Sequence, residues 1–102
     1  MQKEATISDD QIYRYKLSRT WDSTKPTILF IGLNPSIADE TIDDPTITRC
    51  INYAKDWGYG TLLMANLFAF RSTYPKDIYL ADNPIGNEND NYILECVAQS
   101  DL

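Results

Sequence analysis

Alternating and continuous apolar segments divide the chain into predicted strands. Residues 12–21 (IYRYKLSRTW) alternate apolar and polar side chains, which is typical of a strand with one exposed face. Residues 27–33 (TILFIGL) and residues 61–70 (TLLMANLFAF) are almost continuously apolar and rich in β-branched and aromatic residues, which predicts two strands covered on both faces. Residues 1–10 are polar and predict a frayed N-terminus.

Two helices are predicted, one between the buried strands and one after them. The first begins with Asp44 as N-cap and Pro45 at the first helical position, and Gly58 is its predicted stop. Its apolar stripe follows helical spacing, at Ile47, Cys50, Ile51 and Ala54. The second is expected to begin near Asn87 or Glu88 and to direct three apolar side chains inward: Ile93, Cys96 and Val97. A short helical turn is expected within residues 75–80.

This order of elements predicts the α/β fold class. Two buried strands joined through a helix form a right-handed βαβ unit, so we expect a parallel central sheet, as in the N-terminal portion of a three-layer sandwich. We expect a flexible N-terminus over residues 1–11 and a single domain over residues 12–102. Because a sheet of two or three strands leaves apolar surface uncovered, we expect the domain to be truncated, or to be completed by a protein partner or a second copy.

The charge of the chain argues against tight, non-specific binding to nucleic acid. Nine Lys and Arg against 15 Asp and Glu give a formal net charge of -6, whereas proteins that grip duplex phosphates are usually basic. The one cluster of positive charge is Arg14, Lys16 and Arg19, which leaves a local basic face possible.

The residue content excludes several chemistries. The sequence has no histidine, so Ser-His-Asp and Cys-His catalysis and His-ligated zinc are excluded. Cys50 and Cys96 are far apart in the sequence, and we expect buried thiols. No cofactor or metal is predicted. No segment has the length of a membrane span or the order of a signal peptide, so we expect a cytoplasmic protein without a membrane partner.

Polar residues gather where the two buried strands end. The carboxyl ends of neighbouring parallel strands are where ligands bind in open α/β sheets, so we expect these side chains to face one pocket. The predicted catalytic residues are Asn34 and Asp39, and the predicted ligand-binding residues are Pro35, Ser36, Asp44, Thr46, Asn66 and Arg71.

Each candidate also has a structural explanation. The run 34–36 is good turn chemistry, and the acidic residues after it are typical of a solvated loop. Asp44 is better explained as a helix cap than as a catalytic group. Asn66 lies within an apolar strand and needs partners, because burying an unpaired amide costs about 1–3 kcal/mol; either a loop backbone or a ligand would provide them. Arg71 suits a phosphate or a surface ion pair.

Several motifs together resemble a family of small bacterial and phage proteins of unassigned function, DUF1643. They are YRYKLSRTWD, LNPSIAD, DDPTITRC, WGYG, NLFAFRST and NENDNYIL, and they cover nearly the whole chain from Tyr13 onward. Members of this family continue past the second helix, so the resemblance implies that their later functional residues are missing here.

Two of these motifs are also similar to motifs of the uracil-DNA glycosylase superfamily. GLNPS resembles the motif after its first core strand, and LLMANLFAFR resembles its next core strand. This resemblance implies that Asn34 orients an attacking water and that Asn66 reads a base edge, in an intact hydrolase of the N-glycosidic bond. The chain departs from the superfamily by lacking its histidine motif and an aromatic stacking partner soon after GLNPS.

Three hypotheses follow for function. The first is a pocket for a nucleobase or nucleotide, free or in nucleic acid, with binding favoured over turnover. The second is a non-enzymatic module that binds a protein partner. The third is a metal-dependent hydrolase that uses the acidic loop at Asp39, Asp43 and Asp44.

Overall fold

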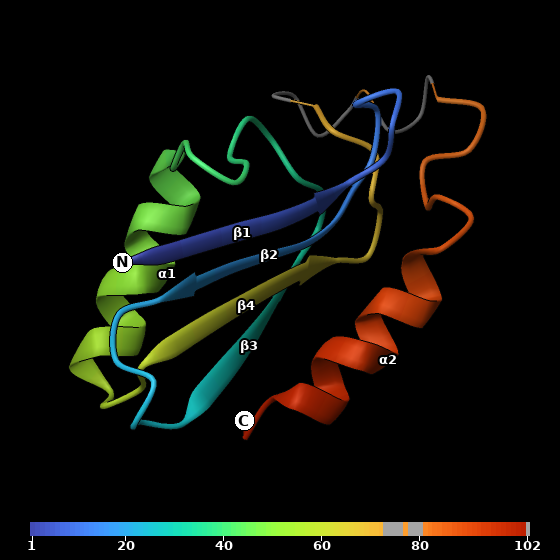
Figure 1. Cartoon of the computed structure of the whole chain (residues 1–102). Coiled ribbons are helices and arrows are strands. Elements are labelled where there is room, and N and C mark those ends of the chain that lie inside the picture. Colours follow the sequence, from blue (N-terminus) through green and yellow to red (C-terminus); the bar gives the residue numbers. More distant parts are fainter. Residues whose placement is uncertain (73–76, 78–80, 102) are drawn as a thin grey trace.

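The described residues form one four-stranded sheet and two helices (Figure 1). The computed structural model describes residues 1–72, 77 and 81–101. Its elements are β1 (Gln2–Ile7), β2 (Arg14–Thr20), β3 (Thr27–Gly32), α1 (Pro45–Asp56), β4 (Thr61–Asn66) and α2 (Asn89–Gln99). The α/β class is therefore confirmed. No helix among the described residues has the length and apolar character needed to cross a membrane.

The sheet is mixed, which corrects the prediction of a parallel sheet. The strand order is β1-β2-β4-β3; β3 and β4 are parallel, whereas β2 is antiparallel to both β1 and β4. A short turn between β2 and β3 reverses the chain direction. The crossover through α1 then returns the chain to the starting end of the sheet, so that β4 runs parallel to β3. The crossover places β4 between β2 and β3, so the parallel arrangement is confined to the predicted βαβ unit.

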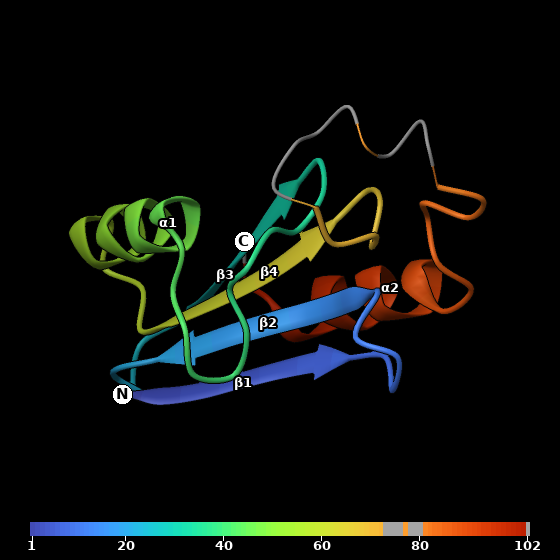
Figure 2. The same cartoon turned by 90° about the horizontal axis from the view of Figure 1, so that it is seen from above.

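The two helices cover opposite faces of the sheet, as Figure 2 shows from above. Alternation along β4 divides the core between them. On the α1 face, Leu62 and Met64 pack with apolar residues of β2 and α1, and on the α2 face Leu63 and Ala65 pack with Cys96. The last side chain of β4, Asn66, has the parity of the α1 face.

The predicted limits of α1 are confirmed. Asp44 Oδ1 accepts a hydrogen bond from the Ile47 main-chain nitrogen at 2.9 Å, and Pro45 is the first helical residue. Gly58, with φ of 87°, follows the end of the helix in the left-handed region that favours glycine. Cys50 is half-buried in the predicted stripe, and both cysteines are free thiols.

The prediction for α2 is partly wrong. Cys96 is fully buried and Ile93 half-buried, but 53% of Val97 is exposed. The helix turns the edge that carries Val97 away from the sheet, because α2 packs mainly on β2 and β4. The helical turn expected within residues 75–80 falls largely outside the described residues.

The N-terminus is also different from the expectation. Polar residues 1–10 predict a frayed end, yet Gln2–Ile7 form β1 and pair with β2 along six register positions. An edge strand needs main-chain hydrogen bonds more than apolar side chains, so its hydrophobic pattern is weak. A salt bridge of 3.3 Å between Lys3 Nζ and Asp43 Oδ2 also ties β1 to the loop before α1.

Candidate functional site

A recess of about 230 Å³ lies at the carboxyl ends of β3 and β4, beside the N-terminus of α1. Six of the eight predicted site residues line it: Asn34, Pro35, Ser36, Asp44, Thr46 and Asn66. Asp39 and Arg71 are not among its lining residues. The remaining lining residues are Arg14, Gly32, Leu33, Ile47 and Met64. The predicted convergence of polar side chains at adjacent strand ends is therefore present.

Asn66 is held so that it offers a hydrogen-bond donor. Only 4% of the residue is exposed, and its Oδ1 accepts a hydrogen bond from Arg14 Nη2 at 3.3 Å. A guanidinium can only donate, so the amide oxygen must face Arg14 and the amide nitrogen must point elsewhere. Within the part of the chain that the structure describes, Nδ2 of Asn66 has no hydrogen-bond acceptor. An acceptor from a ligand would complete its bonding.

Gly32 provides the space for this amide. A Cβ atom at position 32 would lie 2.8 Å from Asn66 Nδ2, well inside ordinary van der Waals contact. Gly32 and Asn66 are register partners in the parallel pairing of β3 and β4, which places the two residues side by side. The glycine of the GLNPS motif is therefore explained by the position of the Asn66 side chain.

Arg14 belongs to the site although the sequence pattern did not indicate it. Only 2% of the residue is exposed; its Nη1 donates to the Ala38 carbonyl at 3.0 Å, and its buried Nε has no partner among the described residues. Burial lowers the pKa of Arg14 to about 10, and the nearby Asp44 carboxylate opposes that shift. The recess thus has a buried cation with one donor still unsatisfied.

A β-bulge in β2 explains why Arg14 was missed. Period-two alternation predicts Arg14, Lys16 and Ser18 on one exposed face. In the structure Thr6 pairs with Lys16 and Ile7 with Arg14, so Tyr15 is the extra residue.

The contacts of the neighbouring side chains show the effect of the bulge. Tyr15 stacks on Tyr92 of α2 with ring centroids 5.2 Å apart, and Lys16 Nζ lies 3.1 Å from Glu95 of the same helix. With both residues directed toward α2, Arg14 turns to the α1 face and into the site.

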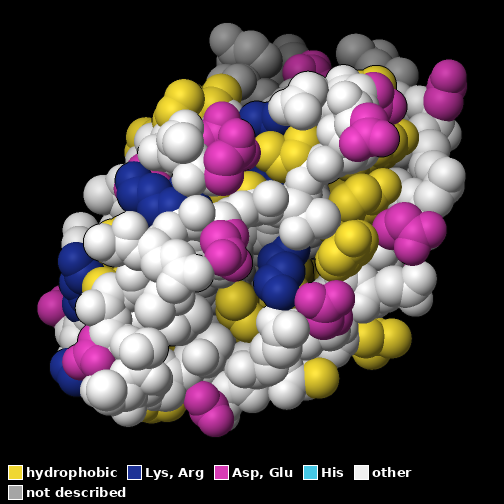
Figure 3. All heavy atoms as spheres, viewed as in Figure 1, with side chains coloured by type: hydrophobic (Ala, Val, Ile, Leu, Met, Phe, Trp, Pro, Cys, Tyr) yellow, Lys and Arg dark blue, Asp and Glu magenta, His cyan; other side chains and the backbone are white. Residues whose placement is uncertain are grey.

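Arg19 is a contrasting case of a buried cation with a structural role. It is fully buried; its Nε lies 2.8 Å from Asp43 Oδ1, and Nη2 donates to the main-chain carbonyls of Asp39 and Ile42. These bonds hold the loop between β3 and α1. Because Arg14 and Arg19 are both buried, the basic cluster seen in the sequence is not a surface patch, and Figure 3 shows basic side chains scattered over the displayed face.

The two polar atoms of the Asn34 side chain have different roles: the nitrogen bonds to the protein, and the oxygen is open to a ligand. Its Nδ2 lies 3.3–3.4 Å from the carbonyls of Pro35, Phe70 and Ser72, which ties the loop after β3 to the segment after β4. Its Oδ1 accepts no hydrogen bond from the described residues. The structural explanation of residues 34–36 as a turn therefore applies to the Asn34 nitrogen, whereas the Asn34 oxygen can bind a water or a ligand.

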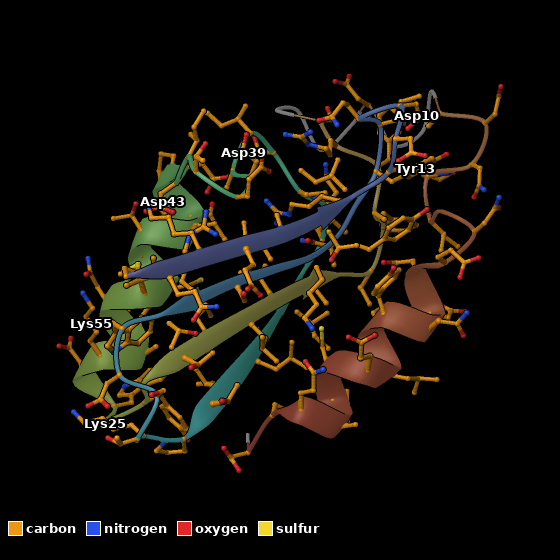
Figure 4. All side chains as sticks on the ribbon, viewed as in Figure 1. Asp10, Tyr13, Lys25, Asp39, Asp43 and Lys55 are labelled. Atoms are coloured by element: carbon orange, nitrogen blue, oxygen red, sulfur yellow. The ribbon has the colours of Figure 1, made fainter. Side chains whose placement is uncertain are left out.

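The acidic residues are engaged by the protein itself. Asp39 Oδ1 accepts from the main-chain nitrogens of Thr41 and Ile42, each at 2.8 Å, and these bonds lower the pKa of the carboxyl. Asp43 pairs with Arg19, and Asp44 caps α1 while its Oδ2 accepts from Ala38 N at 3.4 Å. Figure 4 shows Asp39 and Asp43 on the loop before α1.

This arrangement does not favour a metal centre. Among residues 1–72, 77 and 81–101, no group of three or more His, Cys, Asp or Glu is placed to hold a metal ion. The catalytic role predicted for Asp39 also lacks support from its position, because its carboxylate closes its own turn outside the recess.

Arg71 lies beside the recess rather than in it. It lines a neighbouring surface depression together with Gln11, Ser36 and Ile37. Its guanidinium lies 3.3–3.4 Å from the main-chain carbonyls of those same three residues. Arg71 therefore braces the loops around the recess, and its predicted contact with a phosphate stays a prediction.

Asn89 is a second residue that sequence reasoning missed. It is fully buried at the start of α2, and its Nδ2 donates to the carbonyls of Asn66 at 2.8 Å and Leu67 at 3.1 Å. It fixes the end of β4 from the face opposite the recess. An asparagine near a helix N-terminus is common as a cap, so its type gives no signal of this role.

The comparison with known proteins gives one match. The family model described as protein of unknown function, DUF1643, matches residues 14–102. No curated protein and no solved structure matches the chain. The match begins at the first residue of β2 and includes every residue that lines the recess.

Proposed function

We propose that this chain, which belongs to the DUF1643 family, binds a nucleobase, free or as part of a nucleotide or nucleic acid, in the recess at the ends of β3 and β4. The observation that carries the proposal is the fixed amide of Asn66. Its oxygen is held by Arg14, so its nitrogen offers a donor to whatever enters the recess.

The free groups of the recess suit the edge of a base. Asn66 contributes an amide donor and Asn34 an amide acceptor, and a base edge carries donors and acceptors side by side in one plane. Leu33, Ile47 and Met64 add apolar surface for the faces of a ring. A few polar groups on an apolar lining are typical of small-molecule sites.

The size of the recess supports a ligand of one ring system. Sites that enclose drug-sized molecules have volumes of about 300–1,000 Å³, whereas this recess has about 230 Å³. A base fits this description better than a whole nucleotide. A sugar and phosphate would lie outside, toward the depression beside Arg71.

The arrangement of the chain also supports a three-layer, uracil-glycosylase-like fold as part of the proposal. The helices lie on opposite faces of the sheet, and GLNPS and LLMANLFAFR each include the end of one of the two strands that form the recess. In that superfamily the asparagine of the core strand that LLMANLFAFR resembles contacts the base edge, as we propose for Asn66.

Binding is favoured over hydrolysis of the N-glycosidic bond. The chain has no histidine, Asp39 lies outside the recess, and the Asp44 oxygens accept hydrogen bonds from Ile47 and Ala38. Hydrolysis would depend on a water positioned by Asn34 Oδ1, with electrostatic stabilisation from the site. We therefore assign the described part of the chain a binding role.

Asn66→Asp tests the proposal with little change of shape. The substitution keeps an oxygen for Arg14 and replaces the free donor by an acceptor. Affinities of wild type and variant are measured by calorimetry against uracil, thymine, cytosine, adenine and guanine, and against their nucleosides and nucleotides. The control is Asn52→Asp, the same change on the exposed face of α1.

If Asn66 donates a hydrogen bond to the base, Asn66→Asp should bind the base more weakly than wild type. Losing this hydrogen bond and leaving a buried acceptor unpaired costs about 1–3 kcal/mol, which is roughly a fivefold to 150-fold loss of affinity. We expect that loss in Asn66→Asp for bases with a carbonyl on the bound edge, and unchanged binding in Asn52→Asp. Equal affinity of wild type and Asn66→Asp, or no binding of any compound to wild type, would refute the proposal.

A further inference from the structure

The side-chain amide of Asn66 has two orientations that a ligand would distinguish. A carboxamide has an oxygen that accepts and a nitrogen that donates, at ends of almost the same shape, so an amide that rotates freely offers either group. Across residues 1–72, 77 and 81–101, Arg14 is the only residue that hydrogen-bonds to this side chain, from Nη2 to Oδ1 at 3.3 Å. Asn89 also contacts Asn66, but at its main-chain carbonyl. The orientation of the Asn66 amide therefore depends on Arg14.

Arg14 is itself fixed in place. Its main-chain nitrogen donates to the Ala69 carbonyl and its Nη1 to the Ala38 carbonyl, both at 3.0 Å. Ala69 follows β4 and Ala38 lies in the loop after β3, so Arg14 is held between the segments that follow the two strands of the recess. Only 2% of the residue is exposed. The guanidinium therefore has no room to swing aside for a reversed amide.

A reversed amide would also lack a compensating bond. A guanidinium only donates, so reversal would place the Asn66 NH2 group against the N–H groups of Arg14 and leave these buried donors unpaired. The charge acts in the same direction: burial lowers the pKa of Arg14 to about 10, which leaves it positively charged at neutral pH. A positive charge attracts the amide oxygen and repels the amide NH2. Both effects keep Nδ2 of Asn66 directed to the recess.

We propose that Arg14 determines which ring edge the recess accepts, by holding the Asn66 amide so that only its donor meets the ligand. The ligand class is then a heterocycle with an exocyclic carbonyl oxygen at the bound position. A ring with an amino group there is rejected, because two N–H groups would face each other without an acceptor. Arg14 acts through Asn66 and is a positioning residue. This inference rests on the proposed binding of a base and names the group by which that base is selected.

Two small rings that differ at one edge test the selection: 2-pyridone and 2-aminopyridine. The first has a carbonyl beside a ring N–H, and the second has an amino group beside an unprotonated ring nitrogen. Each ring has a single polar edge, so neither can bind through another one. Dissociation constants are measured by NMR titration at a pH at which 2-aminopyridine is uncharged. We expect wild type to prefer 2-pyridone at least about tenfold, since 2-aminopyridine leaves Nδ2 facing another donor.

Variants at position 14 test the role of the arginine. Arg14→Met removes the donor and the charge, and Arg14→Gln replaces them by an amide that either donates or accepts, so we expect both to lose most of the preference. Arg14→Lys retains a charged donor and should retain it. The matched control is Lys16→Met, which removes a cation from the same strand, where Nζ lies 3.1 Å from Glu95 of α2. The ratio of the two affinities separates positioning from stability, because both rings bind the same folded fraction.

A measurement on wild type does not depend on how well the variants fold. Binding of 2-pyridone should move the Asn66 Nδ2 proton signals downfield in NMR spectra, as the hydrogen bond to the carbonyl forms. The side-chain signals of Asn52, which is exposed on α1, should stay unchanged. Asn66 signals that do not move when 2-pyridone is bound would refute the proposal.

The remaining outcomes distinguish this inference from the proposed function. If 2-pyridone and the bases bind, but the preference is the same in wild type, Arg14→Met and Arg14→Gln, base binding stands and the role of Arg14 is refuted. Equal affinity of wild type for the two rings would refute it as well. If neither ring nor any base binds wild type, the proposed function fails and this inference fails with it.

Discussion

Replacing Gly32 by alanine tests how firmly the Asn66 amide is held. The new Cβ atom would lie 2.8 Å from Asn66 Nδ2 and 3.9 Å from Met64 Sδ, whereas ordinary contacts begin at 3.4 Å. Gly32 is not among the positive-φ glycines, so alanine is compatible with the backbone. The amide nitrogen must move, and a free side chain would do so at little cost. Asn66 is not free, because Arg14 holds its oxygen.

Two opposing contributions set the size of the effect. Alanine in place of glycine stabilises by about 0.4–1 kcal/mol when the backbone allows it, because the unfolded chain loses freedom. Overpacking of a well-filled site costs about 1–3 kcal/mol. The net expectation for Gly32→Ala is a loss of about 1–2 kcal/mol in the free energy of unfolding, together with weaker ligand binding. If the amide yields easily, the first contribution dominates and the variant is more stable than wild type.

A double-mutant cycle with Asn66→Ala isolates the contact. Asn66→Ala removes Nδ2, so alanine at position 32 no longer meets it, and we expect a coupling of about 1 kcal/mol or more in urea unfolding. Gly58→Ala is the control: no heavy atom lies within 4 Å of the point that a Cβ atom would occupy there, but its φ of 87° makes the change unfavourable for backbone reasons. It should destabilise without coupling to position 66. A Gly32–Asn66 coupling below about 0.5 kcal/mol, the usual error of additivity, would refute this account of the site.

Three further predictions follow from the same contacts. Asp39→Asn keeps an oxygen for the Thr41 and Ile42 nitrogens and should leave ligand affinity unchanged. Because those bonds lower the pKa of Asp39, they stabilise the wild type fully above pH 3.8, its ordinary pKa, and this stability is lost as the pH falls through the lower pKa of the folded state. Urea unfolding between pH 5 and pH 2 should therefore show a smaller loss of stability at acid pH in the variant than in wild type. Arg19→Met should lower the free energy of unfolding by about 3 kcal/mol or more, because it leaves Asp43 and two loop carbonyls without their buried donor. The control variant Lys25→Met, on the surface, should change the free energy of unfolding by less than about 0.5 kcal/mol. Cys96 is fully buried and burial raises its pKa, so a thiol reagent should label the half-buried Cys50 first and reach Cys96 at a rate set by unfolding; faster labelling of Cys96 in the native protein would contradict its place in the core.

The parts of the fold that local physics determines are the parts that the sequence predicts well. The N-cap at Asp44, the proline after it and the glycine at position 58 act through neighbouring residues, so the limits of α1 follow from the residue types. The two apolar runs become β3 and β4 for a similar reason. Their parallel pairing follows from the long connection through α1 between them. The parallel pairing in turn brings Asn34 and Asn66 together at the same end of the sheet.

What the sequence did not predict depends on long-range pairing. β1 is polar and exists because β2 offers it an edge, and the direction of β2 depends on where β4 is inserted. The bulge at Tyr15 arises from that pairing and reverses the face of Arg14, so a residue expected in solvent becomes the buried partner of Asn66. Asn89 contacts β4 only after α2 has packed on the sheet. Such residues have no local signature.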